Sequence, residues 1–272
     1  MSSEFMQPLI RVESVSKYYR QRRILSSGHI VHALNGVSLS IAPRSTLALV
    51  GESGSGKSTL ALCLACLERP SSGKIWFGGR DIATLAENQM RAVRPQIQLI
   101  FQDPASSLNP RFTAFEIVTE PLVLQRWKGR QTREQGFALL ERVGLSAEMA
   151  SRRVGEFSGG QKQRLAIARA LSLEPKILIL DEALSALDCS AQARITNLLL
   201  ELQSSFALTY LFITHDLAMA AHIADEIAVM NRGRIVERGD PQKLLDSPEH
   251  EATRRLVAAT PQSIITSRML GA

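Results

Sequence analysis

The sequence predicts an α/β fold in which a parallel β-sheet is covered by helices. Short apolar runs with the character of buried strands recur along the chain, and segments with helical patterns separate them. These runs are Leu47–Val50, Ile97–Phe101, Ile177–Leu180, Tyr210–Thr214 and Ile227–Met230. They are almost continuously apolar instead of alternating, which is typical of strands buried on both faces. We therefore expect them to form the central strands of the sheet.

The segments before and between these runs indicate what surrounds the core. Leu9–Val15 and Val37–Ile41 have strand character with no long helix between them, so they predict an antiparallel portion near the N-terminus. From Pro104 onward, Pro-rich loop chemistry gives way to helical patterns at Phe115–Gln125 and Thr132–Val143. We expect these helices to form an insertion between two core strands.

The last part of the chain predicts a short helical tail. The tail begins after Gly239, and Ser247-Pro248 interrupts it before a second helical piece at Glu251–Ala259. No internal repeat is evident in the sequence.

The composition is that of a folded globular protein. Of 272 residues, 45% are hydrophobic and 21% are charged, which argues against disorder. The 32 basic and 26 acidic residues give a net charge of +6 without a long Lys/Arg tract for nucleic acid or lipid. No run approaches the roughly 20 apolar residues of a membrane span, and the N-terminus lacks a secretory signal pattern. We expect a cytoplasmic protein that binds no nucleic acid.

A glycine-rich segment directly follows the predicted strand Leu47–Val50 and matches the pattern GxxxxGK[ST]. Its glycines let the backbone curl so that N–H groups point inward, and the following helix presents its positive end to a phosphate. Lys57 supplies a cation for the β- and γ-phosphates, and the Ser58 hydroxyl can bind Mg²⁺. A glycine-rich turn with an exposed lysine is the alternative, which the strand–helix context disfavours. The predicted nucleotide-binding residues are Gly51, Glu52, Ser53, Gly54, Ser55, Gly56, Lys57, Ser58 and Thr59.

Two carboxylates follow the predicted strand Ile177–Leu180. A phosphate loop needs a second, carboxylate-bearing strand to complete its Mg²⁺ site, and Asp181 is expected to hold the ion through water. Glu182 is placed to orient or deprotonate an attacking water. The alternative is that these are two solvated acids at a strand end. The presence of the glycine-rich loop earlier in the chain disfavours it.

The segment Phe157–Arg164 resembles the LSGGQ signature of the nucleotide-binding subunits of ATP-binding cassette (ABC) transporters, with Phe157 in place of the usual Leu. The resemblance implies a phosphate-loop NTPase (RecA-like) core with an N-terminal antiparallel β portion and a helical insertion. It also implies one nucleotide-binding domain over residues 1–272, with a helical signature subdomain at 104–165 and a C-terminal helical extension at 240–272. ATP and Mg²⁺ are the cofactors that it implies.

Further elements of this family occur in order along the chain. Gln102 resembles the glutamine that contacts Mg²⁺ or the attacking water, and His215 resembles the switch histidine that touches the γ-phosphate. Tyr19 is the best match to the aromatic that stacks on adenine, with Tyr18 as its rival. The implied catalytic residues are Lys57, Gln102, Glu182 and His215, and the implied Mg²⁺ ligands are Ser58, Gln102 and Asp181.

The signature also implies a second chain. The helix that begins after Ser158 offers another anion-binding end, which in this family faces the γ-phosphate of ATP held by a partner subunit. Ser185–Asp188 resembles the loop that crosses the dimer contact. The residues implied to touch nucleotide across this contact are Ser158, Gly159, Gly160, Gln161 and Asp188.

Two segments narrow the resemblance to the oligopeptide, dipeptide and nickel uptake branch. They are Phe101–Pro110 and Ser247–Leu256, although Glu251 stands where Pro is common and Ala252 where Tyr is common. The branch implies transmembrane permease subunits, a second homologous ATPase, with a homodimer as the alternative, and a substrate-binding protein. It places the chain peripherally at the cytoplasmic face of the cell (inner) membrane. The alternatives are a soluble ABC ATPase acting in nucleic-acid or translation processes, an exporter ATPase, and a regulatory module without turnover.

Overall fold

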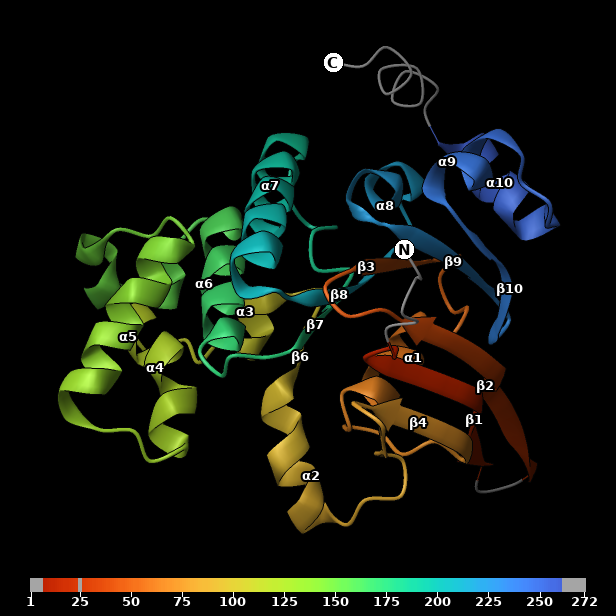
Figure 1. The fold of residues 1–272 in the computed structure, drawn as a ribbon, viewed down its shortest axis with the longest axis horizontal. Helices are drawn as coiled ribbons and strands as arrows, with labels where there is room; N and C mark the ends of the chain where they lie inside the picture. The colour runs from red at the N-terminus through yellow and green to blue at the C-terminus, as the bar shows by residue number, and fades with distance from the viewer. Residues whose placement is uncertain (1–6, 24–25, 261–272) are drawn as a thin grey trace, which may run out of the picture. The chain divides into compact units, whose positions relative to one another are not determined.

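A computed structural model describes residues 7–23 and 26–260 of the chain (Figure 1). Its contacts divide the chain into two compact units, of which the first comprises residues 1–91 and 209–272 and the second residues 92–208. The predicted helical subdomain at 104–165 falls within the second unit. The predicted extension at 240–272 belongs to the first, and its residues 261–272 lie outside the described part. The domain boundaries stay predictions.

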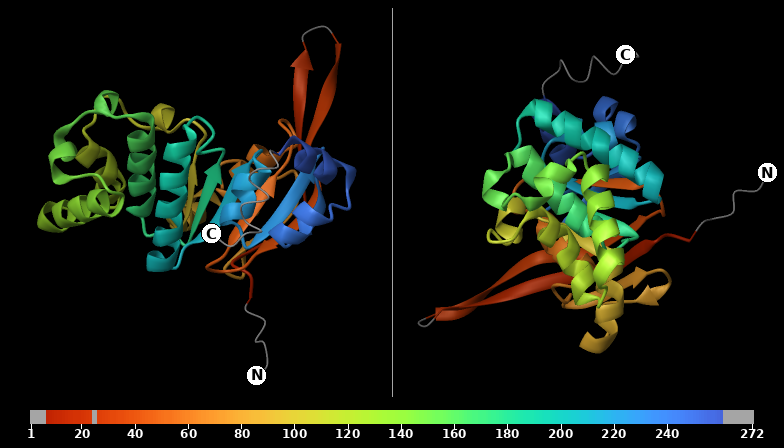
Figure 2. Two further views of the ribbon diagram at one scale, coloured as in Figure 1. Left: turned by 90° about the horizontal axis from the view of Figure 1, so that it is seen from above. Right: turned by 90° about the vertical axis from the view of Figure 1, so that its left-hand side faces the viewer.

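One sheet of the first unit is antiparallel, as the sequence predicts for the N-terminal region. It contains β1 (Ile10–Arg23), β2 (Ser26–Ile41), β4 (Ser72–Phe77) and β5 (Arg80–Asp81) in the order β2-β1-β4-β5. The inner ends of β1 and β2 bear the buried apolar residues, with Ile10 paired to Ile41. Both strands run further than predicted and continue into a long hairpin (Figure 2).

The other strands of the first unit place the glycine-rich loop. Strand β3 (Thr46–Val50) lies between β8 (Thr209–Thr214) and β9 (Glu226–Asn231), parallel to both, and β10 (Arg234–Gly239) is antiparallel to β9. All residues of β3 and β8 are buried. The prediction of strands buried on both faces is confirmed for these two runs. It is wrong for Ile97–Phe101, whose strand is only partly buried and whose Phe101 side chain is 40% exposed.

Helix α1 (Lys57–Leu64) starts at the end of the glycine-rich loop. The apolar run of the sequence continues to Leu67, but the helix ends at Leu64. Cys66 adopts φ +57° and turns the chain away, which leaves Leu67 53% exposed. Leu60, Ala61, Cys63 and Leu64 are buried, so the two turns of the helix are packed.

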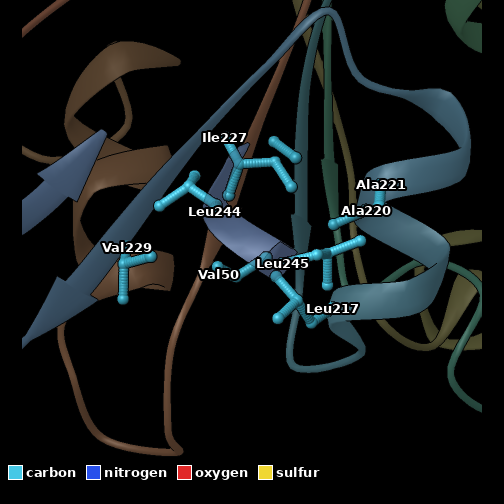
Figure 3. Packing of buried hydrophobic residues seen from close by; sticks show 9 residues of the cluster. Val50, Leu217, Ala220, Ala221, Ile227, Val229, Leu244 and Leu245 are labelled. Atoms are coloured by element: carbon cyan, nitrogen blue, oxygen red, sulfur yellow. The ribbon is translucent and has the colours of Figure 1, made fainter. Parts of the chain in front are cut away.

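The helical tail packs onto the first unit. After α8 (Leu217–Ile223) and the strands that follow it, the chain forms α9 (Pro241–Asp246) and α10 (Glu251–Ala259), as predicted. Leu244 and Leu245 of α9 join one apolar cluster with residues of β3, α8 and β9 (Figure 3). The cluster therefore connects the tail with the strand that leads into the glycine-rich loop.

The second unit is built on two parallel strands, β6 (Ile97–Ile100) and β7 (Ile177–Asp181), and is otherwise mainly helical. The predicted insertion is present as α4 (Ala114–Leu124) and α5 (Gly129–Arg142), seen in yellow-green and green in Figure 2. The remaining helices are α2 (Glu87–Val93), which crosses the unit boundary, α3 (Pro104–Ser107), α6 (Gly159–Leu171) and α7 (Cys189–Phe206), with 3₁₀ turns at Arg94–Gln96, Ala147–Ser151 and Val154–Glu156.

Within residues 7–23 and 26–260, no helix combines the length and the apolar character needed to span a membrane.

Candidate functional site

The glycine-rich loop joins β3 to α1, as the sequence predicts. Gly56 immediately precedes α1 with φ +110°, a conformation that favours glycine. A Cβ atom on Gly56 would lie 2.4 Å from the carbonyl oxygen of Ala33, and one on Gly51 would lie 2.2 Å from that of Met230. Both positions therefore need glycine because neighbouring backbone presses against the loop.

Lys57 is the buried cation of this loop. The residue is only 5% exposed. Its ammonium group donates hydrogen bonds to the carbonyl oxygens of Gly51 at 2.8 Å and Glu52 at 2.9 Å. The alternative of a surface lysine on a plain turn is thus wrong. A buried ammonium bonded to neutral carbonyls is well placed for an anionic ligand.

The loop is also anchored from outside. The backbone N–H of Gly233, in the turn between β9 and β10, donates to the carbonyl oxygen of Ser55 at 2.8 Å. The Ser55 hydroxyl is buried and has no hydrogen-bond partner among the described residues. Because buried polar atoms are rarely left unsatisfied, this orphaned hydroxyl fits a cradle that is completed by a phosphate. Ser53 and Gly54 are exposed at its rim.

His215 leaves the sheet at the same edge as this loop. The parallel pairing of β3 with β8 places Val50 beside Thr214, so Gly51 and His215 follow neighbouring strands. The Thr214 hydroxyl accepts from the N–H of Asp216, whose carboxylate in turn caps α8 by accepting from Met219 N at 3.0 Å. These bonds hold the turn in which the exposed His215 side chain lies.

Tyr18 and Tyr19 lie on the outer part of β1, and both side chains are partly exposed. The Lys17 ammonium lies 5.1 Å from the centre of the Tyr19 ring, whereas the Tyr18 ring is 6.2 Å from that of His32. Lys17 pairs with Leu34, whose side chain is next to Gly56. This stretch of β1 therefore passes near the glycine-rich loop, and the choice between the two tyrosines stays a prediction.

The second unit brings the predicted carboxylates and Gln102 to one edge. Ile100 pairs with Leu180 in the parallel β6–β7 ladder, so Gln102 and Asp181 follow neighbouring strand ends. Asp181 is 9% exposed. Glu182 adopts φ +48°, an uncommon conformation for a residue with a side chain, which is typical of functional turns.

Ser185, the first residue of the predicted dimer-contact loop, forms hydrogen bonds to both Glu182 and Gln102 at this edge. Its hydroxyl donates to the carbonyl oxygen of Glu182 at 2.8 Å and accepts from the Gln102 side-chain amide at 3.5 Å. A serine three residues after Glu182 in a turn is the signal for the first bond. The second bond joins residues far apart in sequence, so no local pattern would reveal it.

The signature segment begins α6 as predicted. Ser158 caps this helix in a reciprocal arrangement with Gln161: the Gln161 N–H donates to the Ser158 hydroxyl at 3.4 Å, and the Ser158 N–H donates to Gln161 Oε1 at 2.9 Å. Ser158 and Gly159 are exposed, and Gly160 is half-buried. Phe157 is buried, which confirms the expectation that it packs.

The start of α7 lies beside the start of α6. Asp188 caps α7 by accepting from the N–H of Ala191 at 2.8 Å. A Cβ atom on Gly159 would meet Leu187 at 3.4 Å, and one on Gly160 would meet Ala191 at 3.7 Å. The two predicted contact loops of the second unit are therefore neighbours.

The predicted Mg²⁺ ligands are a hydroxyl, an amide and a carboxylate, the oxygen donors that this ion accepts. Ser58 lies exposed in the first turn of α1, in the first unit, while Gln102 and Asp181 belong to the second. The described part of the chain holds no group of three His, Cys, Asp or Glu residues that could bind a metal unaided. The donor set fits an ion that also binds phosphate oxygens.

A buried parallel strand, a glycine-rich loop with a buried lysine and a helix N-terminus together define a phosphate-loop nucleotide-binding protein. Comparison with known proteins then identifies the family. The protein family described as "ABC transporter" matches residues 34–185, which are more than half of the sequence. The chain belongs to the ABC transporter family.

Its relatives carry peptide-transport names. It is 48% identical to the probable peptide ABC transporter ATP-binding protein y4tS of Sinorhizobium fredii, over 93% of this chain and 72% of that protein. It is 47% identical to the oligopeptide transport ATP-binding protein OppD of Mycobacterium bovis, over 93% of this chain. The match spans 42% of that OppD.

Among solved structures, the chain resembles the dimeric ATP-binding cassette MJ0796 bound to ADP and Pi. The TM-score is 0.76 at 29% identity, with coverage of 85% of this chain and 98% of that one. The fold predicted from the sequence is confirmed.

Proposed function

We propose that this chain is the ATP-binding and ATP-hydrolysing subunit of an ABC importer. The observation that carries the proposal is the phosphate loop, which combines the buried Lys57 with a buried Ser55 hydroxyl that has no hydrogen-bond partner among the described residues. The similarity to a cassette bound to ADP and Pi supports ATP as the nucleotide.

The residues of the chain divide the work of phosphoryl transfer to water. Lys57 and the loop N–H groups bind the β- and γ-phosphates, and Ser58, Asp181 and Gln102 would hold Mg²⁺. When bound, Mg²⁺ neutralises charge on the phosphate oxygens.

Glu182 acts on the attacking water, and His215 contacts the γ-phosphate. Positioning and electrostatics supply most of the rate in such reactions. The strained turn at Glu182 and its bond from Ser185 then serve to hold the base in place.

The proposed cargo is oligopeptides or dipeptides, with nickel or its chelates as the second possibility from the sequence resemblance. The peptide-transport names of the relatives favour the first. The chain would work at the cytoplasmic face of the inner membrane, with permease subunits and an extracytoplasmic substrate-binding protein.

A second ATPase subunit completes the proposal. The exposed start of α6, with Ser158 and Gly159, would face ATP held by another chain. The uptake branch suggests that this chain is a homologous partner, so the functional unit would be a heterodimer.

The helical insertion carries an apolar surface that suits a permease. Val123 and Leu124, at the end of α4, are exposed, Leu124 by 77%. Val123 also lines a groove of about 580 Å³ between α4 and α5, together with Phe115, Trp127 and Phe137 among others. Large exposed apolar side chains beside a groove are typical of binding surfaces.

The test is peptide uptake by cells in which a variant replaces this chain. Glu182→Gln should abolish uptake of labelled di- and tripeptides and stop ATP turnover in the purified complex. Glu201→Gln, on the exposed side of α7, is the matched control and should change neither. Persistent uptake with Glu182→Gln would contradict the proposal, and tagging the chain in membranes would identify its permeases and second ATPase.

A further inference from the structure

We propose that Asn35 of β2 is a positioning residue for the phosphate loop, because it holds the turn between β9 and β10 that fixes the backbone of this loop. The inference rests on the proposed function, since its effect is on ATP binding at the loop. It assigns a role in that binding to a residue that lies outside all the nucleotide-binding motifs of the sequence.

Asn35 lies in a bulge of the antiparallel β1–β2 ladder. Between the pairs that Val15 and Lys17 form with β2, two residues of β2 stand opposite one residue of β1. These two residues are Asn35 and Gly36, and Gly36 adopts φ +68°. Such a bulge turns backbone groups out of the ladder. The Asn35 N–H accordingly donates outside the β1–β2 ladder, to the carbonyl oxygen of Gly233 at 2.8 Å.

The side chain of Asn35 binds the next residue along, Arg234. In the amide orientation that gives each donor an acceptor, the Asn35 oxygen accepts from Arg234 Nε at 3.2 Å and from Nη2 at 3.0 Å. Hydrogen bonds from a charged guanidinium are stronger than those between neutral groups. Asn35 therefore binds two successive residues at the turn, Gly233 through its backbone and Arg234 through its side chain.

The turn also packs closely against β2. Gly233 is buried with φ +76°, and a Cβ atom on it would lie 2.9 Å from the carbonyl oxygen of Ala33 and 3.3 Å from Asn35 N. The same Ala33 oxygen would lie 2.4 Å from a Cβ atom on Gly56 of the loop. Residues 33–35 of β2 thus contact the turn, and Ala33 contacts the loop as well.

The turn determines the direction of one peptide group of the loop. The Gly233 N–H donates to the carbonyl oxygen of Ser55 at 2.8 Å. Because the C=O and N–H of a trans peptide point in opposite directions, this bond directs the Gly56 N–H away from the turn. Backbone N–H groups on the inner side of such a loop bind the α- and β-phosphates. A turn that is held less firmly lets this peptide rotate, and ordering it again on binding costs affinity.

The experiment measures the dissociation constants of ATP, ADP and AMP by calorimetry, with Glu182→Gln as the background to prevent turnover. Asn35→Ala loses the bonds to Arg234 and should weaken ATP and ADP binding about three- to tenfold. AMP lacks the β-phosphate and should lose less. Asn35→Asp keeps an acceptor for Arg234 and should bind as the parent does.

Ser38→Ala is the matched control on the same strand. It removes a hydrogen bond within the β1–β2 sheet, in which Ser14 N donates to the Ser38 hydroxyl at 2.9 Å. All three dissociation constants should be unchanged. Hydrogen exchange at the Gly233 amide should accelerate in Asn35→Ala and stay at the parent rate in Ser38→Ala. A general loss of stability would instead accelerate exchange throughout the sheet.

Arg234→Ala tests whether the two residues act as a pair. It should weaken ATP binding as much as Asn35→Ala does, and the double variant should bind no worse than either single variant. Additive losses would overturn the inference, and so would equal ATP affinities for Asn35→Ala and Ser38→Ala. Lys57→Ala separates this failure from that of the proposed function. If Lys57→Ala also keeps full ATP affinity, the phosphate loop does not bind ATP at all.

Discussion

The phosphate loop of the first unit and the starts of helices α6 and α7 in the second unit differ in how they are built. In the loop, Lys57 is buried and the backbone of Ala33 and Met230 closes on the glycines. At the starts of α6 and α7, Ser158 and Asp188 are exposed and cap their own helices. The first arrangement is a cradle made within one unit. The second offers an exposed helix end, which suits a phosphate brought by another chain.

Glu182→Gln should give the largest effect and separates chemistry from binding. We expect turnover of the assembled complex to fall about 10²–10⁴-fold, because the variant lacks the general base. ATP affinity should stay near that of the wild type, since the cradle lies in the first unit. Steady-state hydrolysis and calorimetry test the two halves of this statement, and hydrolysis near wild type would remove Glu182 from catalysis.

Lys57→Ala should weaken ATP binding at the phosphate loop of the first unit. Loss of a charge-assisted bond to phosphate costs about 1.5–3 kcal/mol, so ATP affinity should fall about 10- to 150-fold. The circular dichroism spectrum should be unchanged because the ammonium donates to carbonyl oxygens of the loop itself, those of Gly51 and Glu52. Unaltered ATP affinity with a native spectrum would show that the loop is not the nucleotide cradle.

The sequence predicts the parts of the fold that are fully apolar. Strands β3, β7 and β8 are buried along their whole length, so their apolar runs are unmistakable. The sequence does not predict strands β4 and β10, because they are largely exposed or half-buried and carry polar residues. Tyr19 of β1 and Val31 of β2 are likewise exposed, and the sequence does not predict that the two strands extend this far.

The candidate site likewise contains features that the sequence predicts and features that it does not. The phosphate loop, Asp181 and the signature are local motifs, and each appears where the sequence predicts it. The bond between Gln102 and Ser185 joins segments distant in sequence. Only the packing of strands and helices brings these two residues together.

Ser185→Ala tests whether Ser185 positions Gln102 and Glu182 in the second unit. Loss of the bonds to Gln102 and Glu182 is expected to lower kcat about two- to tenfold, the range for one uncharged hydrogen bond, with KM for ATP unchanged. Ser185→Thr retains the hydroxyl and should recover most of the rate. An equal loss in both variants would indicate a packing role instead of a positioning one.

Glu237→Gln should have the smallest effect and probes how firmly α10 is seated. Partial burial acts to raise the pKa of Glu237, but hydrogen bonds from Glu249 and His250 outweigh it and lower the pKa. The carboxylate therefore stabilises the fold fully above the usual glutamate pKa of about 4.3, and this contribution is lost as the pH falls through the lowered value. We expect Tm to drop about 1–2 °C at neutral pH. The difference from wild type should disappear in acid, and a difference that grows there would contradict the assignment.

The central claim is that the cradle binds ATP within one chain while the signature serves a nucleotide on another. ATP titration of the isolated chain, comparing Ser158→Arg with Lys57→Ala, tests it most directly. The account predicts that Ser158→Arg keeps its dissociation constant within about twofold of wild type, whereas Lys57→Ala loses affinity. If Ser158→Arg weakens ATP binding by the isolated, folded chain as much as Lys57→Ala does, both motifs act on the same chain's nucleotide and the claim is wrong.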